Sequence, residues 1–159
     1  MGNYRRNHNR RGLRKNLFSF LYRQVTLSFS RLLLYLENLP PFASEFALDL
    51  AAKLSAKVFA LYILDENRIK KRMREENKER EKVKEEMEEF AWQKLYEIED
   101  LAGKKEVKIH LLLLEGKVSQ ILREVMESYE IGLLILSRDS QLNISRFLEQ
   151  NREKGVLVL

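Results

Sequence analysis

A cluster of small and charged residues, Ser137-Arg138-Asp139-Ser140, follows directly on the apolar run 133–136. Backbone amides and hydroxyls at the end of a buried strand, just ahead of a new helix, hold a phosphate in many α/β proteins. The stretch therefore raises phosphate binding as a first hypothesis. A serine nucleophile is a second reading of the same residues, but the chain has no Gly-x-Ser-x-Gly elbow, and helix capping is favoured instead.

Other residues that could do chemistry give weaker signals. His110 lies inside an apolar run with no nucleophile motif beside it, which favours a structural histidine. The sequence has no cysteine, no His-Glu-x-x-His motif and no Walker loop, so neither a metal site nor a P-loop is predicted. No catalytic residue is predicted, and the abundant Glu residues are read as solvated helix faces.

The elements that must position these residues alternate along the chain. Continuous apolar runs predict buried strands, and apolar residues at a spacing of three and four predict helices. The strands are expected at 31–37, 57–64, 106–114, 131–136 and 156–159, and the helices at 43–54, 68–102, 118–129 and 142–152. This order predicts an α/β fold: a single doubly wound, Rossmann-like three-layer sandwich with a five-stranded, mainly parallel sheet.

The predicted helix 68–102 is unusually long, and its part 72–82 is almost wholly charged. Its second half places apolar residues on one face and ends near Gly103. We interpret the charged part as an exposed, projecting start of this helix rather than a coiled-coil arm. Trp92 lies beside the apolar face and is predicted to pack rather than to stack on a ligand.

Three segments together resemble the universal stress protein family. They are SEFALDLAAKLSAKVFALYILDE (44–66), LLEGKVSQILREVMESYEIGLLIL (113–136) and GVLVL (155–159). Each segment alone is degenerate, and it is their order and spacing that carry the resemblance, over about residues 31–159.

Nucleotide-binding members of that family carry Gly-x-x-Gly, nine residues, then Gly-Ser or Gly-Thr after the fourth strand. On this pattern Ser137-Arg138-Asp139-Ser140 replaces both glycines of the first motif, and Leu142-Asn143 stands at the Gly-Ser position. About eight residues of the loop are missing. The resemblance therefore implies a member that lacks the ATP-binding glycine loop, with no cofactor expected.

An alternative is a nucleotide-dependent switch in which ATP or another adenine nucleotide still binds the remodelled loop, with slow hydrolysis left open. The first strand ends in Glu37-Asn38, whereas nucleotide-binding members tend to have Asp there. Ile63 stands at the position whose backbone would contact the adenine. The residues that would hold the nucleotide in this case are Glu37, Asn38, Ile63, Ser137, Arg138 and Ser140.

The net charge of +5 comes from the head of the chain. Residues 1–31 hold eight of the 29 Lys and Arg residues and no Asp or Glu, so the remainder carries 21 basic and 24 acidic residues. We treat 1–30 as a basic extension, flexible or amphipathic, and 31–159 as the domain. A further alternative function is therefore a membrane- or nucleic-acid-tethered adaptor, with an acidic surface contacted by Arg5, Arg6, Arg10, Arg11, Arg14 and Lys15.

The favoured function is a non-enzymatic regulatory or stress-response protein of the cytoplasm, acting on a protein partner that the sequence does not name. The final apolar strand leaves a sheet edge open. Because the family commonly dimerises through its last strand, the resemblance implies a homodimer through Val156, Leu157, Val158 and Leu159. The charge-rich, cysteine-free composition is a slight hint of a thermophilic source.

Overall fold

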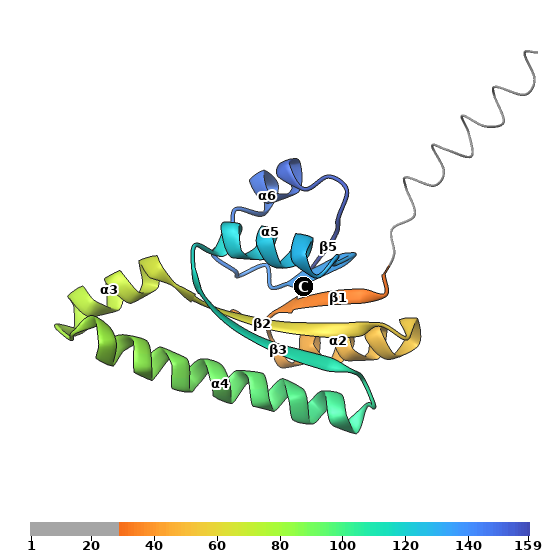
Figure 1. Cartoon of the computed structure of the whole chain (residues 1–159), viewed down its shortest axis with the longest axis horizontal. Coiled ribbons are helices and arrows are strands. Elements are labelled where there is room, and N and C mark those ends of the chain that lie inside the picture. The colour runs from red at the N-terminus through yellow and green to blue at the C-terminus, as the bar shows by residue number, and fades with distance from the viewer. Residues whose placement is uncertain (1–28) are drawn as a thin grey trace, which may run out of the picture.

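The computed structural model describes residues 29–159 (Figure 1). The predictions made for the basic extension, including its six contact residues between Arg5 and Lys15, therefore lie outside the described residues.

A five-stranded sheet forms the middle layer of the fold, and all of its strand pairs are parallel. The predicted α/β sandwich is confirmed, and every predicted strand is present. The strands occur in the order β3-β2-β1-β4-β5 across the sheet. Their bounds are β1 (Arg31–Tyr35), β2 (Lys57–Asp65), β3 (Ile109–Gly116), β4 (Leu133–Leu136) and β5 (Gly155–Val158).

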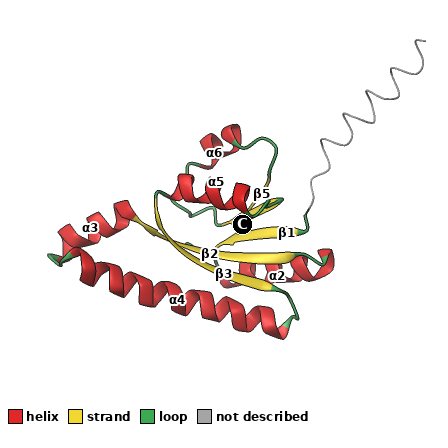
Figure 2. Ribbon diagram, in the orientation of Figure 1, coloured by secondary structure: helices red, strands yellow, loops and turns green. Residues whose placement is uncertain are grey.

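Helices cover both faces of this sheet (Figure 2). They are α2 (Pro41–Leu54), α3 (Glu66–Glu76), α4 (Arg80–Lys104), α5 (Val118–Ser128) and α6 (Ile144–Gln150). Within residues 29–159, none of these helices is both long and apolar enough to cross a membrane.

Alternating residues of the central strands feed two separate cores, because successive side chains of a strand point to opposite faces. Leu32 and Leu34 of β1 pack in one core with residues of α2 and α4. Leu33 and Tyr35 pack in the other core with residues of α5 and with Phe147 of α6. Figure 1 shows the same division, with α2 and α4 on one side of the sheet and α5 and α6 on the other.

The prediction of one helix over 68–102 is wrong: the segment forms two helices, α3 and α4, joined by a tight turn. Asn77 ends α3 in the left-handed conformation with φ 50°, and its backbone N–H donates to the carbonyl of Met73. Asparagine adopts this conformation more readily than most residues, which makes it a common helix stop. The chain then reverses, so α3 folds back beside α4 instead of extending it (Figure 1).

Ion pairs hold the two helices together at the turn. Arg72 of α3 contacts Glu76 and, at 2.7 Å, Glu86 of α4, while Lys78 contacts the same two carboxylates. Hydrogen bonds from Arg72 and Lys78 lower the pKa of Glu76 to about 2. The charged run therefore forms the turn of a helical hairpin: it is largely exposed, as predicted, but it does not begin one continuous helix.

Candidate functional site

The carboxyl ends of β1 and β4 meet at the point where the sheet order reverses. β1 pairs with β2 on one side and with β4 on the other, and the two connections leave toward opposite faces. Ligands of doubly wound folds bind in the crevice at such a switch point. The site predicted from sequence maps to this location, since Glu37 and Asn38 follow β1 and Ser137, Arg138 and Ser140 follow β4.

The turn after β4 directs its backbone donors at the protein itself. The N–H of Arg138 donates to the carbonyl of Leu159 at 2.8 Å. The N–H of Asp139 donates to the hydroxyl of Ser137 at 3.1 Å, and the N–H of Ser140 donates to the carbonyl of Ser137, also at 3.1 Å. A phosphate-binding turn leaves such N–H groups pointing at the ligand. Here the three consecutive donors already have acceptors within the chain.

Across the crevice, Asn38 lies in the left-handed region with φ 50°. Its side-chain amide donates to the carbonyl of Asp139 at 3.0 Å, so one hydrogen bond links the end of β1 directly to the turn after β4. The rim of the switch point is thereby closed by protein groups.

Glu37 is nearly fully buried and is also engaged. Its carboxylate accepts hydrogen bonds from the hydroxyl of Tyr35 at 2.7 Å and from the guanidinium of Arg68 at 2.6 Å. Burial, with a further contribution from Glu37, raises the pKa of Tyr35 well above its usual range. Glu37 is therefore part of an internal ion pair that joins β1 to α3.

The remaining predicted residues lie in the core or beneath the turn. Ile63 is buried with the α5 and α6 core, and Ser137 is buried at the end of β4. Among the described residues, the hydroxyl of Ser140 is a buried polar group without a hydrogen-bond partner. The structure thus gathers Asn38 and the turn 137–140 at one edge, while Ile63 faces inward and Glu37 pairs with Arg68.

Sequence reasoning missed a cavity of about 430 Å³ on the α5 and α6 side of the sheet. Its lining includes Asp65 at the end of β2, which is 6% exposed and has no hydrogen-bond or ion-pair partner among the described residues. Exposed cationic side chains surround it; they are Lys117, Arg123 and Arg146. The sequence did contain two signals for this cavity. Asp65 is a carboxylate that ends a buried strand, and Lys117 is a cation that directly follows the end of the next strand at Gly116.

Arg68 was missed as well. It lines a second cavity of about 430 Å³, on the α2 and α4 side, together with Tyr62, Phe90 and Lys94. In the sequence Arg68 is one of many charged residues that open a predicted helix. Only the fold brings it back to the end of β1. His110, the residue read as structural, stacks on Phe59 with ring centroids 5.4 Å apart.

A model of the universal stress protein family matches residues 40–151, and the chain belongs to this family. The resemblance inferred from the three segments is confirmed. No curated protein matches the chain.

Solved structures give the same fold at low sequence identity. A universal stress protein family member from Burkholderia pseudomallei has a TM-score of 0.66 at 16% identity, covering 84% of this chain and 97% of that one. A universal stress protein from Archaeoglobus fulgidus has a TM-score of 0.58 at 14% identity, with 87% and 98% covered. A universal stress protein solved in complex with cAMP has a TM-score of 0.58 at 12% identity, with 83% and 97% covered.

Proposed function

We propose that this universal stress protein is a non-enzymatic regulatory protein that does not bind adenine nucleotides at the switch point between β1 and β4. Family membership supports a role in the stress response. The observation that carries the proposal is the use of the N–H groups of Arg138, Asp139 and Ser140 by acceptors inside the protein. A phosphate placed there would have to displace hydrogen bonds already made, which costs free energy for each donor.

The electrostatics of the same edge support the proposal. Asp139 would bring a carboxylate close to any phosphate, and like charges at short range repel. On the other rim, the Asn38 amide that could contact a nucleoside is bound to the carbonyl of Asp139. Opening this edge would break that link between β1 and β4.

Calorimetric titration of the full chain with ATP and Mg²⁺, and separately with cAMP, tests the proposal. We expect no binding heat up to 1 mM ligand, which corresponds to a dissociation constant above about 1 mM or a binding free energy weaker than about 4 kcal/mol. Micromolar binding that is lost in the double variant Ser137→Ala and Ser140→Ala would overturn it.

A second candidate function is a nucleotide-dependent switch that uses the cavity beside α5 and α6. The cationic side chains of Lys117, Arg123 and Arg146 around this cavity favour it, because phosphates are bound by such groups. A related fold is known in complex with cAMP. Here binding would survive the double serine substitution and would be lost with Arg123→Gln and Arg146→Gln, so one titration series separates the two candidates.

The open edge of β5 supports a homodimer. β5 pairs with β4 along one edge, and no strand among residues 29–159 pairs with its other edge. Two such edges can pair across a two-fold axis. We therefore propose a cytoplasmic homodimer through Val156, Leu157, Val158 and Leu159, acting on a protein partner. A membrane- or nucleic-acid-tethered adaptor remains the alternative for the basic extension.

A further inference from the structure

The helix α4 has one buried side and one outer face. Its buried residues recur at helical spacing and pack in the core with β2 and β3; they are Val83, Met87, Ala91, Leu95, Ile98 and Ala102. On the outer side, a shallow depression of about 980 Å³ is lined by acidic and aromatic residues. Six of the lining residues are called the acidic face below: Glu85, Glu88, Glu89, Trp92, Tyr96 and Asp100.

The acidic face carries a negative charge that is only partly compensated, since among its carboxylates Glu88 pairs with Lys84 at 3.7 Å. Residues 85–100 hold seven Asp and Glu residues and a single basic residue, Lys94. Lys94 pairs with Glu97 at 2.7 Å. Within residues 29–159, no cation lies within ion-pair range of Glu85, Glu89 or Asp100, and all three are exposed. A cationic partner would therefore gain attraction here without breaking an existing pair.

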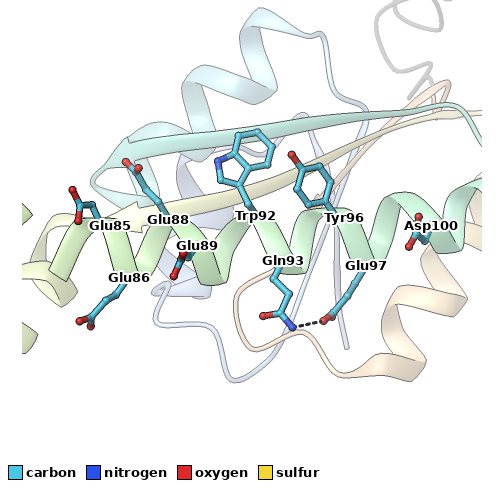
Figure 3. Close-up of a pocket in the computed structure, with 9 residues that line it drawn as sticks. All are labelled: Glu85, Glu86, Glu88, Glu89, Trp92, Gln93, Tyr96, Glu97 and Asp100. Carbon is cyan, nitrogen blue, oxygen red and sulfur yellow. Dashed lines mark hydrogen bonds between the residues drawn. The ribbon is translucent and has the colours of Figure 1, made fainter. Parts of the chain in front are cut away.

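Two aromatic rings lie among these carboxylates. Trp92 and Tyr96 are 38% and 55% exposed, and their rings stack with centroids 5.5 Å apart. Figure 3 shows both rings projecting side by side from α4, with Glu88 and Glu85 following along the helix. Trp92 therefore packs on Tyr96, while more than a third of it stays exposed. An exposed tryptophan flanked by carboxylates is a favourable surface for a guanidinium, which stacks on the ring and pairs with the acids.

The chain itself contains a segment with the complementary chemistry. Residues 1–28 carry seven basic side chains, Arg5, Arg6, Arg10, Arg11, Arg14, Lys15 and Arg23, and no Asp or Glu. We propose that this basic segment docks on the acidic face of α4 in the same chain. This inference does not rest on the proposed function, because neither surface belongs to the switch point.

The topology makes the contact reachable. The basic segment is followed directly by Phe29, which packs against the core shared with α2 and α4. The carboxyl end of α4, near Asp100, leads into the amino end of β3. β3 pairs in parallel with β2, and β2 with β1, so the amino ends of these strands lie at the same edge of the sheet. Asp100 therefore lies toward the edge at which the basic segment enters β1. A 28-residue linker has a root-mean-square span of about 30 Å, and α4 is about 37 Å long. A tether of this span gives the basic segment a millimolar effective concentration at the acidic face of its own chain. Docking within one chain is therefore favoured over docking on a second copy.

Energy transfer tests the proposal in the full chain, because Trp92 is the only tryptophan and the chain has no cysteine. A single Asn9→Cys substitution places an acceptor dye between two arginine pairs. We expect transfer from Trp92 to the dye in 20 mM salt and at least a twofold drop in 1 M salt, where charges more than about 3 Å apart are screened. The triple variant Glu85→Lys, Glu89→Lys and Asp100→Lys should reduce low-salt transfer to the high-salt value.

A matched control reverses three exposed charges on the other side of the sheet: Glu124→Lys, Glu127→Lys and Glu149→Lys. Docking on α4 predicts that this control keeps the transfer of the parent chain. A second test leaves the domain unchanged and replaces Arg5, Arg6, Arg10 and Arg11 by serine, which should also abolish the salt-sensitive transfer.

Three outcomes would overturn the proposal. One is transfer that is insensitive to salt and to the α4 charges. Another is an equal loss in the control variant, which would assign the effect to net charge alone. The third is transfer that falls when labelled chain is mixed with a tenfold excess of unlabelled Trp92→Phe chain, which would assign the contact to a second copy.

Discussion

At the residue scale, polar groups that the sequence places at strand ends pair with one another in the fold. Glu37 is the clearest case: it is 4% exposed and is held by Tyr35 and Arg68. The sequence predicted that Glu37 and Asn38 lie at the end of β1. It did not predict their partners, because Arg68 and Asp139 come from segments 31 and 101 residues away.

Removing Arg68 should destabilise the fold, because it leaves the buried carboxylate of Glu37 without its cation. We expect Arg68→Met to lower the free energy of unfolding by about 2 kcal/mol, less than for a fully buried pair since Arg68 is one-third exposed. Urea unfolding measures this loss. The double variant Arg68→Met and Glu37→Gln removes the orphan charge and should recover at least half of it; no recovery would contradict the pairing.

The buried Tyr35 should make the free energy of unfolding fall at alkaline pH. Burial, with the charge of Glu37, raises the pKa of Tyr35 in the folded state. Above the unfolded tyrosine pKa of about 10, the unfolded chain releases a proton that the folded chain retains. Stability is therefore fully present below pH 10 and falls as the pH rises beyond it. The slope of unfolding free energy between pH 10 and 12 should be shallower in Tyr35→Phe, and an unchanged slope would refute the assignment.

At the element scale, periodicity predicted five strands and the amphipathic helices, because buried strands and one-sided helices leave strong apolar patterns. The break between α3 and α4 left no such pattern. Every residue from Lys78 to Lys82 is polar, so no apolar residue marks a change of direction. The break is set instead by the left-handed Asn77 and by ion pairs from Arg72 and Lys78 to Glu86.

Two substitutions of Asn77 test this helical hairpin, because alanine and glycine should change the stability of the protein in opposite directions. Asn77→Ala should cost about 1 kcal/mol, because an alanine is strained at a positive φ. Asn77→Gly should be neutral or stabilising, because glycine adopts this conformation freely. Thermal unfolding of both variants measures the difference. If 68–102 were one continuous helix, alanine would stabilise it relative to glycine, so that order of stabilities would contradict the structure.

At the scale of the whole molecule, the resemblance of three segments to the universal stress protein family predicted the fold, and the family model confirms it. What could not be predicted is how surfaces are distributed. The cavity beside α5 and the closed edge between β1 and β4 each combine residues from distant segments. Periodicity predicts which residues are buried, but not which exposed residues become neighbours.

The proposed homodimer gives a prediction at this scale. The N–H groups of Gly155 and Leu159 donate toward β4, so the alternating geometry directs the N–H of Val158 to the open edge. Val158→Pro should remove that donor without disturbing the pairing of β5 with β4. Sedimentation should show two chains for the parent protein and for the control Val158→Thr, and one chain for the proline variant. A parent protein of single-chain mass would rule out the dimer.

The central claim is that the edge between β1 and β4 is closed by the protein's own hydrogen bonds and does not bind an adenine nucleotide. Its most direct test is an NMR titration of the ¹⁵N-labelled full chain with ATP and Mg²⁺. We expect the amide resonances of Asn38 and of residues 138–140 to stay unchanged up to 1 mM nucleotide. Saturable shifts of those same amides at micromolar nucleotide would contradict it.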